Sequence, residues 1–189
     1  MNAPPTAGRL FVAVPLGAPT RRAVAAYLAR AFGPSVPGRA VLPDAWHLTL
    51  RFLGETPAEA AARLRARLAA ADLGRAFDLS IEGPGAFPSP ARARVLWLGV
   101  GRGAGPLATL AAAVEAAALA AGFAPETRPF EGHLTVSRLK VGADLRAEMA
   151  AAPPFSRRER VSGIVLLQSH LGAGPPRYVP LETFPLAPA

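Results

Sequence analysis

The sequence contains no cysteine, and this absence excludes disulfide bonds, a thiol nucleophile and any zinc site built from thiolates. Only three histidines occur, and no HxH, HD or DxD grouping stands beside them. A metallophosphoesterase centre needs more ligands than this set offers. We therefore expect no metal and no cofactor, in a protein of a reducing compartment.

Long apolar runs are also missing. The stretch nearest to a membrane span, Pro106 to Phe123, contains Thr109 and Glu115 and owes most of its apolar character to alanine. Its larger side chains recur at helical spacing, which predicts a packed helix. The first residues show no basic segment followed by an apolar run, so no signal peptide is predicted. We expect a cytoplasmic protein that contacts no membrane.

The composition that remains is that of a globular chain. Hydrophobic residues make up 51% and charged residues 18% of the 189 residues, and this length suits one domain or two lobes that share a core. The net charge is +8, and Lys140 is the only lysine among the 21 basic residues. Such a charge is typical of a protein with a polyanionic partner, but an arginine-rich, GC-biased codon usage would produce it too.

Alternation, helical spacing and turn signals predict a chain that contains both strands and helices. Thr56 and Glu59 have the spacing of a capping box, with Gly54 ending the preceding strand. A turn at Gly172 to Pro176 separates the last two strands. The expected strands are 10–16, 47–53, 77–82, 95–100, 133–138, 155–161, 164–169 and 178–184, and the expected helices are 19–32, 57–71, 106–121 and 144–151.

The second half of the chain repeats the order of elements in the first. Phe11 precedes His47 by 36 residues, and Val95 precedes His133 by 38. This similarity predicts an internal duplication within a single domain, with halves of about 9–90 and 91–189. We expect the boundary near residue 90 to separate two lobes.

Two of the histidines stand in the same short motif, His-x-Thr-x, read as HLTL from residue 47 and HLTV from residue 133. On a strand, alternation places His47 with Thr49, and His133 with Thr135, on one face and the apolar residues on the other. An approximate twofold axis between the halves would then gather two imidazoles and two hydroxyls around one phosphate.

These residue types suit the cleavage of a phosphodiester. One group must take a proton from water and another must give a proton to the leaving oxygen, and imidazoles with a pKa near 6.5 can do both. Hydroxyl and guanidinium groups can hold the phosphoryl oxygens. The sequence predicts two catalytic residues, His47 and His133, and four phosphate-binding residues, Thr49, Thr135, Arg51 and Arg138.

A non-catalytic RNA- or nucleotide-binding module would use the same residues to grip phosphate without turnover. Such modules stack bases on aromatic side chains, but aromatic residues make up only 7% of this chain. Trp46, Phe11 and Phe87 are the aromatic residues we expect nearest to the motifs, and each is predicted to belong to the core.

The sequence resembles the 2H phosphoesterases and, within them, the bacterial and archaeal RNA 2',3'-cyclic phosphodiesterases, also called 2'-5' RNA ligases. The residues that carry the resemblance are RLFVAV from residue 9, HLTLRFLGE from residue 47, FEGHLTVSR from residue 130, QSHL from residue 168, and then Tyr178 and FPL from residue 184. Gly132 departs from the family pattern, in which a proline precedes the second histidine.

The resemblance implies a bilobal α+β fold, with two pseudo-symmetric lobes, antiparallel sheets around a central cleft, and helices outside. It implies metal-independent hydrolysis of RNA 2',3'-cyclic phosphate ends to 2'-phosphomonoesters, a step of RNA processing, with reversible 2'-5' ligation as a side activity. His47 would be the proton donor and His133 the acceptor, although the near symmetry of the motifs leaves this order open.

Other substrates stay open as well, namely small cyclic nucleotides, ADP-ribose cyclic phosphate and 2'-5' oligonucleotides. The expected partner is RNA with a 2',3'-cyclic phosphate end, or a nucleotide. The expected oligomeric state is a monomer.

Overall fold

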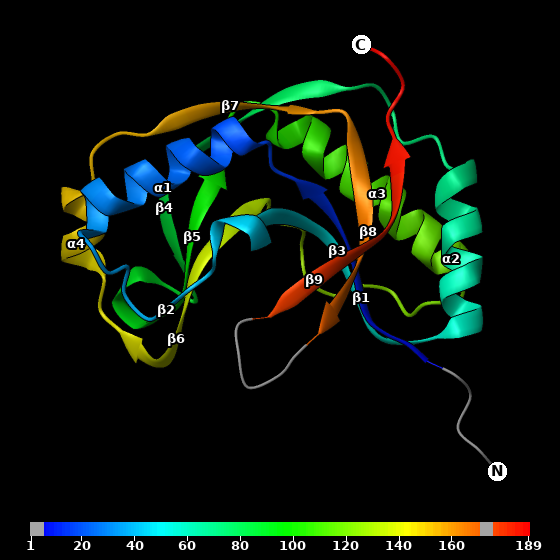
Figure 1. The fold of residues 1–189 in the computed structure, drawn as a ribbon, viewed down its shortest axis with the longest axis horizontal. Helices are drawn as coiled ribbons and strands as arrows, with labels where there is room; N and C mark the ends of the chain where they lie inside the picture. Colours follow the sequence, from blue (N-terminus) through cyan, green and yellow to red (C-terminus); the bar gives the residue numbers. More distant parts are fainter. Residues whose placement is uncertain (1–5, 171–175) are drawn as a thin grey trace.

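The computed structural model describes residues 6–170 and 176–189, so the predicted turn lies outside the described residues apart from Pro176. The described chain is ordered as an α+β fold (Figure 1). Its elements are β1 (Thr6–Pro15), α1 (Ala18–Phe32), β2 (Arg39–Ala40), a 3-10 turn (Pro43–Ala45), β3 (His47–Pro57), α2 (Ala58–Ala70), β4 (Phe77–Phe87), a 3-10 turn (Pro90–Arg92), β5 (Ala93–Val100), α3 (Ala104–Ala120), β6 (His133–Ala143), α4 (Arg146–Ala151), β7 (Ser156–Val161), β8 (Gly163–His170) and β9 (Arg177–Pro185).

The strands form one curled antiparallel sheet in the order β7-β4-β5-β6-β3-β1-β8-β9, and β2 pairs with β6. In the middle of the sheet, β3 and β6 pair at Leu48 opposite Leu134. This narrow junction separates a first lobe (β3, β1, β8, β9) from a second lobe (β6, β5, β4, β7). The predicted two-lobed α+β architecture is confirmed.

Each lobe is covered by two helices (Figure 1). Helices α2 and α3 pack together on the first lobe, where both contact β3, and α1 and α4 pack together on the second lobe, where α1 contacts β7. The chain crosses between the lobes several times, and two of these crossings, after β1 and after β5, lead directly into a helix. Helix α1 therefore covers the second lobe although β1 belongs to the first, and α3 covers the first lobe although β5 belongs to the second.

The predicted lobe boundary near residue 90 is wrong. Strand β4 belongs to the first half of the sequence, but it pairs with β5 and β7 in the second lobe. Strand β8, near the end of the chain, pairs with β1 of the first lobe over Arg9–Ala13. Strand pairing joins residues that are distant in sequence, so alternation within either half carries no sign of this exchange.

The predicted capping box at the start of α2 is also wrong. Strand β3 continues past Gly54 to Pro57, and α2 begins at Ala58. The hydroxyl of Thr56 donates to the carbonyl oxygen of Gly54 at 2.9 Å and makes no bond to the helix. Gly54 has a φ of 73°, and the pairing of β3 with β1 shifts beside it, so the glycine bends the strand instead of ending it.

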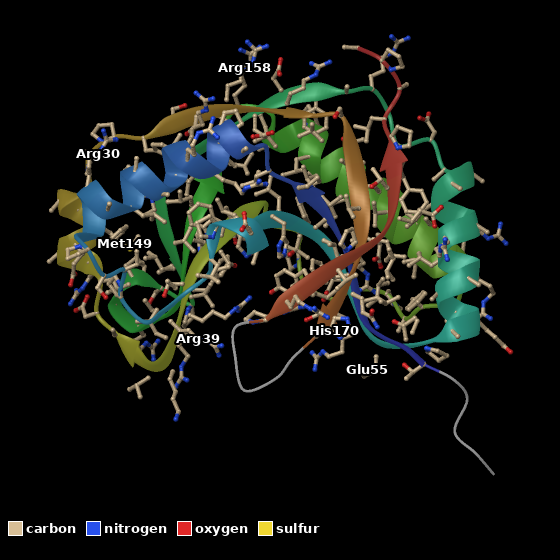
Figure 2. The ribbon with its side chains drawn as sticks, viewed as in Figure 1. Arg30, Arg39, Glu55, Met149, Arg158 and His170 are labelled. Carbon is tan, nitrogen blue, oxygen red and sulfur yellow. The ribbon has the colours of Figure 1, made fainter. Side chains whose placement is uncertain are left out.

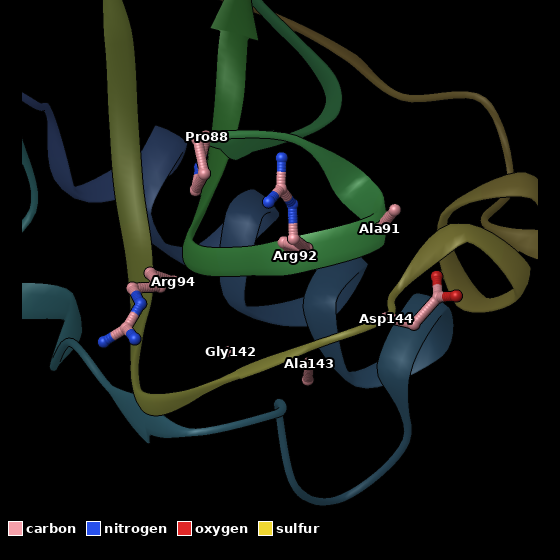
Figure 3. A pocket seen from close by; sticks show the side chains of 7 residues that line it. All are labelled: Pro88, Ala91, Arg92, Arg94, Gly142, Ala143 and Asp144. Atoms are coloured by element: carbon pink, nitrogen blue, oxygen red, sulfur yellow. The ribbon is translucent and has the colours of Figure 1, made fainter.

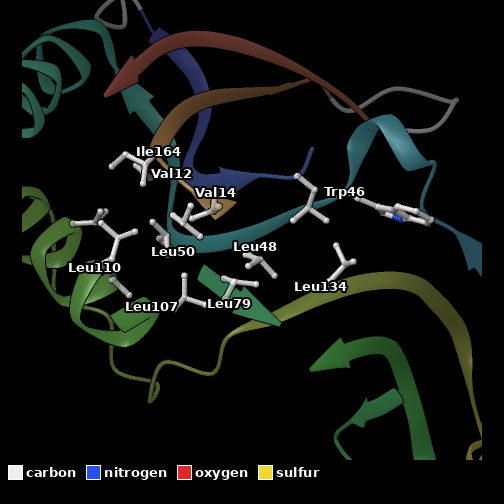
Figure 4. Packing of buried hydrophobic residues seen from close by; sticks show 14 of the residues in the cluster. Val12, Val14, Trp46, Leu48, Leu50, Leu79, Leu107, Leu110, Leu134 and Ile164 are labelled. Carbon is white, nitrogen blue, oxygen red and sulfur yellow. The ribbon is translucent and has the colours of Figure 1, made fainter. Parts of the chain in front are cut away.

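The core lies between the sheet and the helices (Figure 4). Leu48 and Leu134 from the two motif strands are fully buried, and Leu107 and Leu110 of α3 belong to the same cluster. The predicted buried stripe of α3 is thereby confirmed. Because Leu48 and Leu134 point into this core, the residues that alternate with them must lie on the opposite face of the sheet.

Candidate active site

The two His-x-Thr-x motifs are neighbours at the centre of the sheet. Leu48 is opposite Leu134 in an antiparallel pair, so equivalent residues of the two motifs are related by a local twofold axis at this point. His47 consequently lies toward Thr135, and Thr49 toward His133. We call this surface the histidine face, defined by His47, Thr49, His133 and Thr135.

The two threonines offer free hydroxyls on the histidine face. Both side chains are partly exposed. Among residues 6–170 and 176–189, no hydrogen-bond partner is found for the hydroxyl of Thr49 or of Thr135. Both are therefore available to donate hydrogen bonds, and their binding of phosphoryl oxygens stays a prediction.

A β-bulge follows the threonine of the first motif. Ala13 of β1 pairs with Thr49, and the preceding Val12 pairs with Arg51, so Leu50 is an extra residue without a partner on β1. One extra residue reverses the faces of all side chains beyond it. Arg51 therefore shares the core side with Val12 and does not lie on the histidine face.

The contacts of Arg51 agree with this placement. Its guanidinium forms ion pairs with Glu115 of α3 and with Glu126, the latter at 3.6 Å, and also donates to the carbonyl oxygen of Ala124. Only 10% of the Arg51 side chain is exposed. The structure thus corrects the position expected for Arg51: this arginine fastens β3 to the helix layer and is not available to phosphate.

The second motif contains the equivalent bulge. Trp97 of β5 pairs with Thr135, and Leu96 pairs with Ser137, so Val136 is the extra residue. Ser137, the counterpart of Arg51, is fully buried on the core side. The two lobes therefore share both the His-x-Thr-x motif and the β-bulge that follows it.

Because of this second bulge, Arg138 lies on the histidine face. It pairs with Val95 of β5 and with Arg39 of β2, and its side chain is exposed. Its positive charge acts on the ring of His47 across the junction of the lobes. Of the six predicted site residues, the structure brings five together, namely His47, Thr49, His133, Thr135 and Arg138.

Both histidine rings are held in the same orientation. Nδ1 of His47 is 2.8 Å from the carbonyl oxygen of Ala45, and Nδ1 of His133 is 2.7 Å from that of Glu131. A carbonyl oxygen only accepts, so Nδ1 carries the hydrogen in both rings. Each neutral ring therefore keeps Nε2 free as a proton acceptor, which is the atom that must exchange protons with a substrate.

The two histidines differ in their electrostatic surroundings. The pKa of His47 is lowered from its ordinary 6.5 to about 4, mainly by burial and also by the charges of Arg138 and His133, while the hydrogen bond to Ala45 acts in the opposite direction. In the free protein His47 is therefore neutral at pH 7. A negative charge beside it would favour the imidazolium and raise this pKa.

An NMR titration of the His47 ring tests this difference. In the free protein we expect a pKa of about 4, and a bound phosphomonoester should raise it because the anion stabilises the charged ring. Removing a cation by Arg138→Ala should also raise the pKa of free His47. His170→Asn, at the end of β8, gives a matched spectrum with one fewer histidine signal. A free His47 that titrates at 6.5 or above would contradict the prediction.

Aromatic side chains surround each histidine, and sequence reasoning missed most of them. Around His47 lie Phe11, with ring centroids 4.9 Å apart, and Tyr178 of β9, at 5.2 Å. Phe52 is 6.0 Å from Phe11 and 52% exposed. Tyr178 comes from the end of the chain, and Phe52 faces this way only because of the bulge, so no local signal in the sequence indicates either.

The surroundings of His133 are different. Phe87 packs edge-on against this ring at 5.0 Å, and Trp97 lies 6.0 Å away. The indole of Trp97 lies against Gly85, where a Cβ would come within 2.1 Å of the ring. Trp46, in contrast, is a core residue as predicted, with 5% exposed.

No group of three or more potential metal ligands occurs within residues 6–170 and 176–189. In the same part of the chain, no helix combines the length and apolar character needed to cross a membrane.

The fold and the paired motifs define the chain as a 2H phosphoesterase. It belongs to the 2'-5' RNA ligase superfamily, whose family model matches residues 21–173.

Curated relatives agree with this assignment. The chain is 39% identical over 147 residues to an RNA 2',3'-cyclic phosphodiesterase of Aeropyrum pernix, with 76% of this chain and 83% of the relative covered. It is 34% identical over 179 residues to the RNA 2',3'-cyclic phosphodiesterase of Escherichia coli, with 94% and 96% covered.

Solved structures share the fold over nearly the whole chain. E. coli LigT complexed with 3'-AMP superposes with a TM-score of 0.80 at 31% identity, covering 95% of this chain and 98% of LigT. TT0787 of Thermus thermophilus superposes with a TM-score of 0.77 at 31% identity, covering 94% and 97%.

Proposed function

We propose that the protein hydrolyses RNA 2',3'-cyclic phosphate ends to 2'-phosphomonoesters. The observation that carries this proposal is the pairing of Leu48 with Leu134, because it brings the two His-x-Thr-x motifs together around a local twofold axis. Curated relatives that match most of the chain are named RNA 2',3'-cyclic phosphodiesterases, which supports the same substrate.

In the proposed reaction, water attacks the phosphorus and the bond to the 3' oxygen breaks. His133 takes the proton from water at Nε2, and His47 gives a proton to the departing 3' oxygen, so the phosphate remains on the 2' oxygen. The negative charge of the bound cyclic phosphate favours the protonated form of His47. Once protonated, a ring whose pKa burial has lowered is a strong proton donor to the leaving oxygen.

The phosphoryl oxygens would be held by the hydroxyls of Thr49 and Thr135 and by the guanidinium of Arg138. These groups already lie on the histidine face, so little reorganisation is needed when charge develops. The same chemistry with an RNA hydroxyl in place of water would join two ends through a 2'-5' bond, and we propose this ligation as a side activity.

The direct test offers the pure protein a short RNA with a 2',3'-cyclic phosphate end and analyses the product. We expect ring opening to a 2'-phosphate, at an unchanged rate after treatment with a chelator, because the proposed groups supply both the proton transfers and the positive charge. A 3'-phosphate product would reverse the roles of the two oxygens. Tight binding of the RNA without turnover would favour the non-catalytic binding module instead, and activity restored only by a divalent ion would contradict the mechanism.

Small cyclic nucleotides and 2'-5' oligonucleotides are the competing substrates, and they belong in the same assay. A kcat/KM for either that exceeds the value for the cyclic-ended RNA would contradict the proposed substrate. We propose a monomer located in the cytoplasm, and sedimentation of the pure protein tests the oligomeric state.

A further inference from the structure

The pseudo-symmetry of the two motif strands makes their outer parts comparable position by position. Beyond the bulges, β3 places Phe52 on the histidine face where β6 places Arg138. Farther out, at positions that are not equivalent, β3 carries the exposed Glu55 and β6 carries the exposed Lys140. The two ends of the histidine face therefore differ in charge although their centres are alike.

Exposed cations gather around the outer part of β6. Arg39 of β2 pairs with Arg138, and Nη1 of Arg94 donates to the carbonyl oxygen of Lys140 at 3.4 Å. In Figure 2, Arg39 lies on the β2 and β6 side, whereas Glu55 lies on the side of the first lobe. We call this group the basic arm, defined as Arg39, Arg92, Arg94, Arg138 and Lys140.

A pocket of about 450 Å³ lies within the basic arm and is lined by Arg92 and Arg94 (Figure 3). The carboxylate in its lining, Asp144, is bound by Arg146 at 2.6 Å, so its charge is already compensated. Pro88 also lines the pocket.

Residues that line the pocket are close in sequence to residues of the candidate active site. The residue before Pro88 is Phe87, whose ring packs against His133. Along β6, Gly142 of the pocket wall lies seven positions after Thr135, a span of at most roughly 23 Å at about 3.3 Å per residue. A single-stranded RNA that covers this distance would place several backbone phosphates along it.

The opposite end of the histidine face offers less positive charge to a polyanion. Arg9 of β1 is exposed there, but it pairs across the strands with Glu55. On this side His47 packs against the rings of Phe11 and Tyr178, and Phe52 lies 6.0 Å from Phe11. An RNA whose cyclic end lies between the histidines must leave the site toward one end, and the basic arm is the end that matches its charge.

We propose that the basic arm binds the RNA chain on the 5' side of the reacting end, as a binding surface separate from the residues that hold the reacting phosphate. This inference rests on the proposed function. It predicts that positive charge far from the reacting phosphate contributes to the kcat/KM of a long substrate and not to that of a short one.

The experiment compares a ten-nucleotide RNA ending in a 2',3'-cyclic phosphate with 2',3'-cyclic AMP. The double variant Arg92→Ala with Arg94→Ala should lower kcat/KM for the RNA by about tenfold or more and leave that for cyclic AMP unchanged. The salt dependence for RNA should also weaken, by about 0.7 in the slope of log kcat/KM against log salt for each phosphate that the variant no longer neutralises. The matched control is Arg22→Ala with Arg30→Ala, the same charge change at exposed positions of α1, and it should alter neither substrate.

Equal losses with both substrates, or no loss with the RNA, would overturn the inference. Absence of turnover of both substrates by the unaltered protein would instead contradict the proposed function. In that case, fluorescence anisotropy with a 3'-phosphorylated ten-nucleotide RNA still tests the inference. If the double variant binds this RNA as tightly as the unaltered protein does, the basic arm does not bind the RNA chain and the inference is overturned. If the double variant fails to fold by circular dichroism, the single change Arg92→Gln gives the same test at a side chain for which the described residues provide no hydrogen bond.

Discussion

Replacing either His47 or His133 with alanine is expected to lower turnover of the cyclic-ended RNA by about 10² to 10⁴ fold. In the proposed mechanism each imidazole moves a different proton, and the hydrogen bonds from Nδ1 to Ala45 and Glu131 leave each Nε2 available for this transfer. The double variant should be little worse than either single one, because residues that act as a unit are not additive.

Steady-state rates across the pH range make this test specific. The unaltered protein should show a bell-shaped profile with two coupled apparent pKa values, and each single histidine variant should lose the bell. His170→Ala is the matched control, since this ring pairs with Gln168 at the end of β8, and it should keep both rate and bell. Near-normal ring opening by a folded His47→Ala or His133→Ala protein would contradict the paired mechanism.

The two motif arginines should respond to substitution in opposite ways. Arg138→Ala is expected to lower kcat/KM by about 10- to 100-fold, because a charged hydrogen bond to phosphate contributes about 1.5–3 kcal/mol, and to leave stability nearly unchanged. Arg51→Ala should instead lower the free energy of unfolding by about 2–3 kcal/mol, since it leaves the carboxylate of Glu115, 25% exposed, without its partner.

Denaturant unfolding and kinetics of the same preparations check this contrast. Arg51→Met keeps the packing of the side-chain stem and should separate loss of the ion pair from loss of volume. Double replacement of Arg51 by Met and Glu115 by Gln should recover part of the stability, because no buried charge is then unpaired. An Arg51 variant that is stable but slow, or an Arg138 variant that is unstable but fully active, would contradict the assignment of Arg51 to the core side and Arg138 to the histidine face.

The pseudo-symmetry of the motifs does not make the two histidines equivalent. His47 is packed by Phe11 and Tyr178 and lies within reach of the charge of Arg138, and these surroundings lower its pKa. Arg138 has no counterpart on the first lobe, where Phe52 occupies the equivalent position. The duplicated motif thus supplies two similar imidazoles, and the unlike residues around them give the two rings different electrostatic surroundings.

Local pattern in the sequence was sufficient to predict much of this protein. The strands around His47 and His133 and the buried stripe of α3 follow from alternation, helical spacing and turn residues, which act over a few positions. The α+β class was implied by the family resemblance. The repeated His-x-Thr-x motif also carried the candidate chemistry, because two copies in equivalent surroundings indicate one shared site.

The tertiary structure alone decided which neighbours of the motifs reach that site. The bulges at Leu50 and Val136 turn Arg51 into the helix layer and Arg138 onto the histidine face, yet both motifs read as unbroken alternation in the sequence. The exchange of β4 and β8 between lobes, and the approach of Tyr178 to His47, join segments far apart in the chain. Such pairings depend on the whole sheet, since the register of each strand is set by partners that no local pattern identifies.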